Sequence, residues 1–374
     1  MMAESLRVLN HILRALMLWC VTLPIGDAFG QTFQTAKYGG DFLSAGVGAK
    51  PLSMGGAYVS LASDATAAVW NPAGLASLGS ADLVLMHSER FAGLVGVDYA
   101  AFALPINGSS GDVVALSVLR QGVDGIANTL NAWDPDRNLP IEGAADEITR
   151  FSATDLAVYV SYGRELGAGN QGSPSGVKVG GSLKFMQTRL GPFAQALSYG
   201  LDLGLQARAG AWRFAAVLTD PVPMLRFWSV DNEELAPLET EYGDEAPEGV
   251  NERILPTLRL GIGREAAWKE FRFAGALDLR VDAENRKAYS LNAGRFGLSP
   301  HFGVEATYRG LASLRFGLTD LVVPPEGAIQ LSPTVGAGLR TGRFRVDYGF
   351  TDFSGYASEL GVTHRVSIGF HLTR

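Results

Sequence analysis

The sequence is nearly free of cysteine, and this scarcity excludes several kinds of site. Cys20 is the single cysteine among 374 residues, and it lies within an apolar N-terminal run. The rest of the chain therefore has no thiol for a disulfide, a zinc–cysteine site or a cysteine nucleophile. The sequence also contains no His-Glu-x-x-His motif and no Gly-x-Ser-x-Gly motif. We predict that the protein is not an enzyme and that it needs no cofactor or metal.

Charged residues are also scarce. They make up 18% of the chain, and the net charge is −7. This balance, without any Lys/Arg cluster, excludes a nucleic-acid partner. The most acidic segment, 231–252, does not have the glycine and carboxylate spacing of an EF-hand, so we expect a solvated surface loop there, with calcium binding as the open alternative.

Long hydrophobic runs are missing as well. The longest candidate, "ALMLWCVTLPI" at 15–25, has about eleven residues, whereas a membrane-spanning helix needs roughly 20. Arg7 and Arg14 precede it, and Ala28 and Gly30 are small residues suited to a signal peptidase. We predict a signal peptide over residues 1–30, with an N-terminal membrane anchor as the alternative.

The sequence has many segments in which apolar and polar residues alternate. In "HRVSIGFHL", Val366, Ile368 and Phe370 alternate with Ser367 and Gly369. Each such strand has one apolar face and one polar or small face. A soluble β-sandwich and an outer-membrane barrel both show this pattern. The segments run roughly nine to twelve residues, which favours tilted membrane strands over sandwich strands of about five or six.

The number and spacing of these segments support the barrel. Counting from Ala81 gives about fourteen, an even number as single-chain bacterial barrels require. Short turns alternate with longer connections, which include 121–152, 220–255 and 282–300. We predict an all-β fold: a transmembrane antiparallel β-barrel of about 14 strands over 81–374, embedded in lipid of the bacterial outer membrane.

One long connection carries a group of large apolar residues. In "PMLRFW", Met224, Leu225, Phe227 and Trp228 lie together within 220–255. An exposed group of this kind could bind a partner or an apolar ligand. Membership of the interfacial aromatic belt, or packing into the barrel mouth, is the alternative. We take these four as candidate partner-binding residues.

The stretch "SMGGAYVSLASDATAAVWNPAGLA" at 53–76 precedes the first strand and resembles a phosphate loop only superficially. Lys50 is followed by Pro51 rather than Ser or Thr, and no strand–helix repeat follows. Instead, the pattern predicts a short helix at 64–70 that Asp64 caps and Asn71 ends. We predict that residues 31–80 form a plug inside the barrel, with candidate plug or gating residues Gly55, Gly56, Asp64, Asn71, Pro72 and Gly74.

"MGGAYVSLASDATAAVWNPAGLA" strongly resembles the N-terminal signature of the PorV/PorQ family of bacterial outer-membrane proteins. Its "NPAGLA" portion is similar to the corresponding segment of the related FadL-type transporters. The resemblance covers about 25 residues of specific motif, while the rest of the chain matches in pattern and length. It implies a fourteen-stranded barrel with an N-terminal plug.

The resemblance implies two different functions. A PorV/PorQ-like protein would be a type IX secretion accessory whose external loops, including 121–152 and 220–255, bind secreted proteins or other secretion-system components. A FadL-like protein would instead be a channel for hydrophobic small molecules, in which the plug moves to open a path. Neither function uses covalent catalysis.

Overall fold

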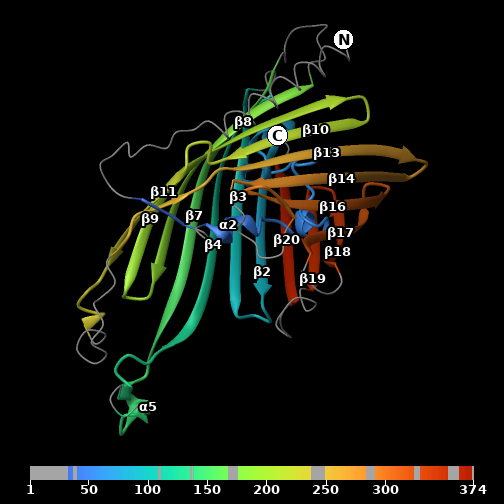
Figure 1. The fold of residues 1–374 in the computed structure, drawn as a ribbon. Coiled ribbons are helices and arrows are strands. Elements are labelled where there is room, and N and C mark those ends of the chain that lie inside the picture. Colours follow the sequence, from blue (N-terminus) through green and yellow to red (C-terminus); the bar gives the residue numbers. More distant parts are fainter. Residues whose placement is uncertain are drawn as a thin grey trace.

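The structure, a computed structural model, describes residues 33–36, 40–107, 111–134, 137, 139–166, 176–236, 249–283, 291–323, 329–352 and 362–372. Within them, 14 antiparallel strands form one closed barrel, which confirms the predicted fold. The first barrel strand, β2 (Ala81–Arg90), pairs with the last, β20 (Val362–Leu372), and so closes the sheet (Figure 1). The predicted signal peptide at 1–30 lies outside the described residues.

The other barrel strands follow one another around the wall in chain order. They are β3 (Val95–Asn107), β4 (Asp112–Asn128), β7 (Thr149–Glu165), β8 (Val177–Leu190), β9 (Ala194–Ala209), β10 (Trp212–Thr219) with β11 (Met224–Val230), β12 (Glu252–Ile254) with β13 (Thr257–Trp268), β14 (Phe271–Asp282), β16 (Phe296–Tyr308), β17 (Ala312–Val322), β18 (Gln330–Thr341) and β19 (Phe344–Asp352). Two short strands join the sheet beside them: β1 (Gln34–Thr35), which is parallel to β12, and β15 (Leu291–Ala293) beside β16.

The apolar face of the strands points away from the barrel. In β20, Val366 and Ile368 are 43% and 48% exposed, whereas Arg365 and Ser367 are 1% and 4% exposed. A soluble sandwich would bury the apolar face, so this arrangement excludes it and gives the wall the surface that lipid requires. No helix among the described residues is long and apolar enough to cross a membrane.

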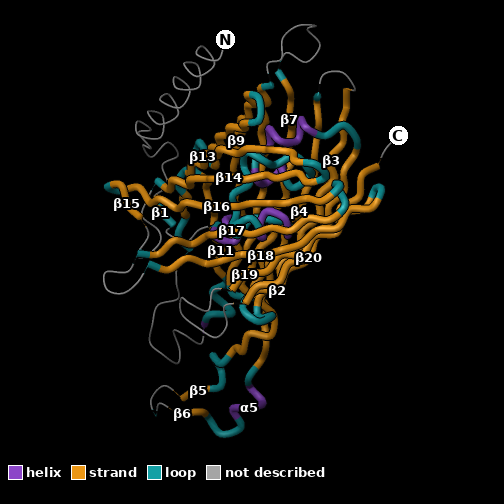
Figure 2. The backbone as a smooth tube through the Cα atoms, turned by 90° about the vertical axis from the view of Figure 1, so that its right-hand side faces the viewer, coloured by secondary structure: helices purple, strands orange, loops and turns teal. Residues whose placement is uncertain are grey.

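The two ends of the barrel differ. At the turn end, hairpins such as those at Gly210, Gly310 and Gly342 are tight, and each of these glycines has a positive φ. At the loop end, the connection between β4 and β7 carries β5 (Trp133–Asp134), β6 (Leu139–Pro140) and α5 (Ala144–Glu147), and this arm projects far from the barrel (Figures 1 and 2). By the usual asymmetry of such barrels, we expect the turn end to face the periplasm.

The predicted long connections are shorter than expected. β4 continues to Asn128 and β7 begins at Thr149, so strands occupy much of 121–152. β11 and β12 likewise occupy parts of 220–255. These strands extend past the apolar segments that were used to predict them, because the ladder of backbone hydrogen bonds continues where the alternation has ended.

The seventh barrel strand is interrupted at Asp220–Pro223, between β10 and β11. Both halves pair with β9, with Thr219 opposite Asp202 and Leu225 opposite Tyr199. Pro221 and Pro223 have no backbone N–H to donate to a neighbouring strand, and Asp220 has a φ of 50°. Leu255 and Pro256 separate β12 from β13 on the adjacent strand. We call Asp220–Pro223 the strand interruption.

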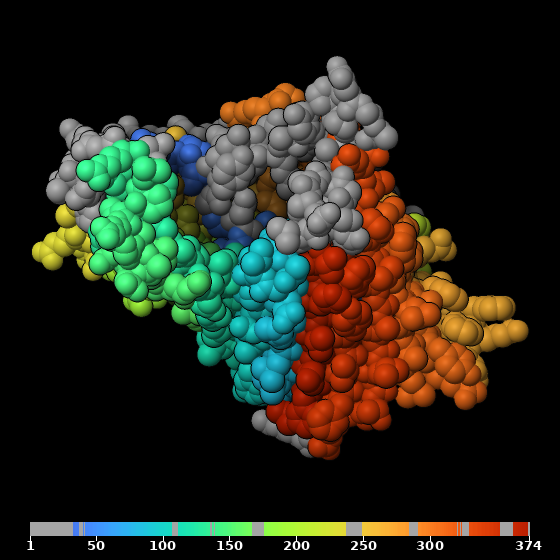
Figure 3. Space-filling model, turned by 90° about the horizontal axis from the view of Figure 1, so that it is seen from below, coloured from blue at the N-terminus to red at the C-terminus, as the bar shows by residue number. Residues whose placement is uncertain are grey.

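The segment before β2 fills the lumen as a plug, as predicted. It contains α2 (Asp41–Ser44), α3 (Ala49–Ser53), α4 (Ala67–Trp70) and the 3₁₀ helix η1 (Pro72–Ser77). Seen from the loop end, the plug lies deep in the hollow of the barrel (Figure 3). The buried apolar core of the molecule consists of plug residues together with inward-facing wall residues. The predicted helix at 64–70 is shorter than expected, because turns replace its first residues.

Candidate functional site: the plug and the wall around it

Gly55 and Gly56 let the plug approach the wall. Their φ angles are +62° and +75°, which side chains larger than glycine rarely adopt. A Cβ on Gly55 would lie 2.6 Å from the carbonyl oxygen of Leu318 and 2.7 Å from that of Phe302. A Cβ on Gly56 would lie 3.3 Å from Nδ1 of His301. Gly55 therefore lies directly against the backbone of β16 and β17, and Gly56 lies against the side chain of His301 on β16.

The wall contributes glycines of its own at the same contacts. A Cβ on Gly303 would lie 2.7 Å from Cβ of Met54, and one on Gly349 would lie 2.7 Å from the carbonyl oxygen of Ala49. A Cβ on Gly317 would overlap the backbone of Met54 and Gly55. We call the inward-facing glycines that touch the plug the glycine bed: Gly163, Gly180, Gly204, Gly261, Gly263, Gly303, Gly317, Gly336 and Gly349. Only glycine lets two backbones pack this closely.

Asn71 and Pro72 end α4, as the sequence predicts, and they also fix the plug to β9. Asn71 is extended, with φ −165°, and its side-chain oxygen accepts a hydrogen bond from the N–H of Ala73 at 3.1 Å. Its amide nitrogen donates to the carbonyl oxygens of Val59 at 3.0 Å and Leu205 at 3.2 Å. Because Asn71 is fully buried, these bonds satisfy a side chain that would otherwise be costly to bury.

Gly74 packs against the plug rather than the wall. A Cβ there would lie 3.1 Å from Cβ of Ala67 and would overlap the carbonyl group of Ala62. We expected the small size of Gly74 to let the plug approach the wall. Its close neighbours lie instead within the plug, where η1 folds back on the turn before α4.

Asp64 is nearly fully buried and has two kinds of partner. One carboxylate oxygen accepts from the N–H of Thr66 at 3.0 Å and from the hydroxyl of Thr66, while the other lies 2.9 Å from Arg345 on β19. Burial alone would raise the pKa of Asp64, but Arg345 and the bonds from Thr66 outweigh it and hold this pKa below its ordinary value. Asp64 therefore joins the plug to the wall as a charged group.

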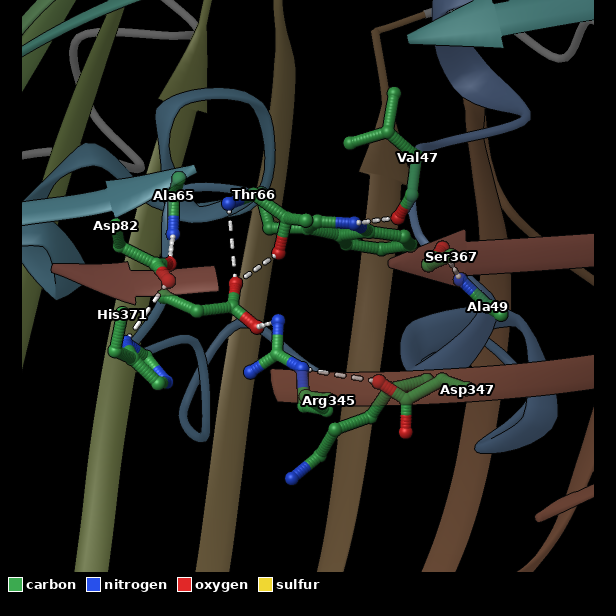
Figure 4. Close-up of polar contacts among 12 residues, drawn as sticks. Val47, Ala49, Ala65, Thr66, Asp82, Arg345, Asp347, Ser367 and His371 are labelled. Atoms are coloured by element: carbon green, nitrogen blue, oxygen red, sulfur yellow. Dashed lines mark hydrogen bonds and ion pairs between the residues drawn. The ribbon is translucent and has the colours of Figure 1, made fainter. Parts of the chain in front are cut away.

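Further polar contacts tie the plug to the seam where the barrel closes. Asp82 accepts a hydrogen bond from the N–H of Ala65 at 2.8 Å and lies 2.9 Å from His371 (Figure 4). The hydroxyl of Ser367 accepts a hydrogen bond from the N–H of Ala49 at 2.8 Å. The guanidinium of Arg365 donates to the carbonyl oxygens of Ala45, Gly46 and Gly48. The seam strands β2 and β20 thus hold the plug by polar bonds to its backbone.

A chain of ion pairs continues from Arg345 across the wall. Arg345 lies 3.0 Å from Asp347, Asp347 lies 2.8 Å from Arg315, and Arg315 lies 2.5 Å from Glu305. Glu305 then returns to the plug through Lys50 at 3.0 Å. The sequence interpretation missed these residues. Charged residues at the inward-facing positions of the strands could have revealed them, because a buried charge requires a partner of opposite charge.

A separate buried ion triad lies beside the strand interruption. The ammonium group of Lys184 on β8 lies 2.8 Å from Asp202 on β9 and 2.8 Å from Asp220. All three side chains are at most 7% exposed. The triad was not predicted, and it joins the first residue of the strand interruption to two neighbouring strands.

A cavity of about 90 Å³ lies between the plug and this part of the wall. On the plug side it is lined by Leu43, Val69 and Trp70, and on the wall side by Met224 and Ile254, among others. The ion triad and Arg259 also reach it. Arg259 lies over the ring of Trp70, 5.0 Å from its centroid. The cavity therefore has a mixed lining, in which apolar side chains lie beside charged groups, and we call it the interruption cavity.

The group Met224, Leu225, Phe227 and Trp228 lies in strand β11, so its predicted placement in a loop is wrong. The residues after Pro223 resume the antiparallel ladder with β9, with Phe227 opposite Leu197. Met224 is only 1% exposed and lines the interruption cavity, while the rings of Phe227 and Tyr199 stack at 5.9 Å. A partner-binding role for this group remains a prediction.

The acidic segment 231–252 lies partly outside the described residues, so calcium binding there stays open. Among the residues that the structure describes, no group of three or more His, Cys, Asp or Glu side chains could hold a metal ion.

These features define a transmembrane β-barrel closed by its N-terminal plug. Among solved structures, the fold is similar to the toluene transporter TodX of Pseudomonas putida, with a TM-score of 0.51 and 13% identity over 91% of this chain and 99% of that one. It is also similar to the toluene transporter TbuX of Ralstonia pickettii, with a TM-score of 0.50 and 13% identity over 88% and 99%. At such identities the likeness establishes the fold alone.

A FadL homologue from Pseudomonas aeruginosa matches with a TM-score of 0.48 and 12% identity over 87% of this chain and 98% of that one. Toluene transporters are thus among the solved structures that share this barrel fold. No family model and no curated protein sequence matches the chain. The similar structures confirm the predicted barrel fold, and the resemblance to PorV/PorQ proteins and FadL-type transporters rests on the plug sequence.

Proposed function

We propose that the protein is a bacterial outer-membrane channel for hydrophobic small molecules, which pass between the plug and the strand interruption. The interruption cavity carries this proposal. Its apolar side chains, which include Val69, Trp70 and Met224, offer contacts to a hydrophobic solute, and it adjoins the place where Pro221 and Pro223 weaken the wall. TodX and TbuX are both toluene transporters, so toluene is the first solute to test.

The cavity is too small to pass such a solute without movement. A cavity that binds benzene measures about 150 Å³, whereas the interruption cavity measures about 90 Å³. Either α4 or the strand interruption must therefore shift during transport. In this proposal Gly55, Gly56, Asp64, Asn71, Pro72 and Gly74 anchor the plug, and the gating movement occurs on the side of Val69 and Trp70.

The test is uptake of labelled toluene by bacterial cells that express the protein, compared with cells that carry an empty vector. Val69→Phe fills the interruption cavity and is expected to lower uptake by several-fold. Val335→Phe is the matched control, because Val335 is 46% exposed on the outer face of β18. Both variants must show the heat-modifiable gel mobility of a folded barrel. Uptake equal to the empty vector, or unaffected by Val69→Phe, would contradict the proposal.

A role as a type IX secretion accessory is the second candidate, supported by the plug sequence and by the arm of β5, β6 and α5. Leu139 and Ile148 on this arm are 59% and 41% exposed, and the arm extends beyond the loop end (Figure 2). Replacing 130–147 with a short glycine linker separates the two candidates. A secretion accessory would lose capture of exported proteins, while a solute channel would keep its toluene uptake.

A further inference from the structure

The turn end of the lumen contains a large chamber that shares no lining residue with the interruption cavity. It consists of two adjoining cavities of about 560 Å³ and 610 Å³. The two cavities have five lining residues in common, four of which are cationic: Lys50, Ser63, Arg213, Arg340 and Arg345. We call the joined space the turn-end chamber.

Half of the cations around the turn-end chamber are neutralised by carboxylates. Lys50 pairs with Glu305, and Arg213 pairs with Glu265 at 2.7 Å. Arg315 and Arg345 belong to the chain of ion pairs that passes through Asp347. The lining carboxylates of Asp64, Glu265, Glu305 and Asp347 are thus already engaged.

The other cations have no carboxylate within 4.0 Å among the described residues. They are Lys178, Arg208, Arg272 and Arg340. Lys178 donates to the hydroxyl of Ser77 at 2.8 Å, and Arg208 donates to the carbonyl oxygen of Gly210 at 3.1 Å. Against these four charges, Glu165 is the remaining described acid in the lining. The chamber is therefore positive although the whole chain carries a net charge of −7.

Arg340 lies at the centre of this excess charge. It lines both cavities, and its guanidinium has no hydrogen-bond partner among the described side chains. Arg340, Arg272 and Arg208 are exposed to solvent, so an anion can reach their guanidinium groups. A cleft lined by charges of one sign concentrates the field and attracts counter-ions. A guanidinium also presents its donors in a planar fork that matches the oxygens of a carboxylate or phosphate.

We propose that the turn-end chamber binds small oxyanions with two or more negative charges, held by Arg340 together with Arg272, Arg208 and Lys178. Each of its two cavities has a volume within the usual range for ligand sites of about 300–1,000 Å³. This site is independent of the hydrophobic path, because the turn-end chamber shares no lining residue with the interruption cavity.

The test is calorimetric titration of the purified full-length barrel in neutral detergent at low ionic strength. Citrate and inorganic phosphate are the two probes, so the experiment distinguishes a polycarboxylate ligand from a phosphate. Binding of either probe, weakened by added salt, supports the site. Arg340→Gln is expected to weaken binding about tenfold, since a charge-assisted hydrogen bond contributes about 1.5–3 kcal/mol.

Arg264→Gln is the matched control. Arg264 lies on the outer face of β13 over the ring of Trp212, at 5.0 Å, and its loss is expected to leave binding unchanged. Arg272→Gln is a second chamber variant, expected to weaken binding in the same direction. Absence of binding for both probes, or equal weakening by Arg264→Gln and Arg340→Gln, would overturn the proposal. Toluene uptake is measured in parallel. A protein without toluene uptake would contradict the proposed channel function, whereas the titration would still test the anion site.

Discussion

The two sides of the barrel hold the plug in different ways. On the side of β16 to β19, the plug backbone at Met54 and Gly55 rests on wall glycines, without side chains between them. At β10 to β12, the wall is interrupted at Asp220–Pro223 and a cavity separates it from Trp70, while Gly261 and Gly263 on β13 touch the plug again. Direct backbone contact leaves no room for rearrangement, whereas a cavity does.

This difference indicates which part of the plug can move. The segment 49–56 is fixed by the glycine bed and by polar bonds from the seam strands. The region of α2 and α4 that faces the strand interruption is bounded by side chains and empty space. A gate at this place would open by moving side chains and α4, while the bed stays in position.

The largest expected effect comes from breaking the buried ion triad on the interrupted side. Lys184→Met leaves Asp202 and Asp220 as adjacent buried carboxylates, and breaking a buried pair costs about 3–5 kcal/mol. The free energy of unfolding in urea measures this change. Lys178→Met is the control on the same face of β8, since Lys178 bonds only to a hydroxyl, and an equally large loss there would contradict the role of the triad.

The next effect concerns the fixed side. Gly317→Val places a side chain into the backbone of Met54 and Gly55, and such overpacking costs about 3 kcal/mol. We expect faster hydrogen exchange at 49–56 while the barrel keeps its heat-modifiable mobility. Gly275→Val is the control, because nothing lies closer than 3.9 Å to a Cβ there. Unchanged exchange in Gly317→Val would show that the bed does not fix the plug.

A smaller effect is expected at the hydrogen bonds of Asn71. Asn71→Ala removes the acceptor for Ala73 and the donor for Leu205, while the carbonyl oxygen of Val59 keeps a second donor in Gln206. Leaving these buried groups unpaired costs about 1–2 kcal/mol. Exchange of the amides at 72–77 should increase more than exchange at 49–56, and the reverse order would contradict the assignment.

The smallest effect is expected from pH. The pKa of Asp64 is lowered in the folded protein, so its contribution to stability is complete above the ordinary aspartate pKa of about 3.9 and is lost only as the pH falls through its lower folded value. The difference in unfolding free energy between the protein and Asp64→Asn should therefore stay constant from pH 7 to about pH 5. A difference that shrinks within that range would show that Arg345 does not hold Asp64 ionised.

The barrel could be predicted from the sequence because a membrane strand leaves a local pattern. Lipid requires apolar residues on one face, so Val366, Ile368 and Phe370 revealed β20 without any knowledge of its neighbours. The end of α4 was equally local, since Asn71 precedes Pro72. β11 was missed because Pro221 and Pro223 mark the start of a loop in sequence terms, although the ladder with β9 resumes at Leu225.

The contacts of the plug could be predicted only in part. The glycines of "MGGA" were visible, but their partners lie on strands far along the chain, and no local pattern connects Gly55 with Gly317. The ion pair between Asp64 and Arg345 is likewise fixed by the register of the closed barrel rather than by spacing in the sequence. Such pairings require the three-dimensional arrangement, because each partner has several other residues of opposite charge within the same lumen.

The closure of the barrel at β2 and β20 has a consequence for biogenesis. The plug precedes β2 in the chain, and it touches wall glycines as far apart as Gly163 on β7 and Gly349 on β19. Because β2 and β20 are hydrogen-bonded along their length, a plug that was still outside the closed barrel would have no opening wide enough to enter it. We therefore expect the N-terminal segment to take its place before β2 and β20 pair, so that the wall assembles around the plug.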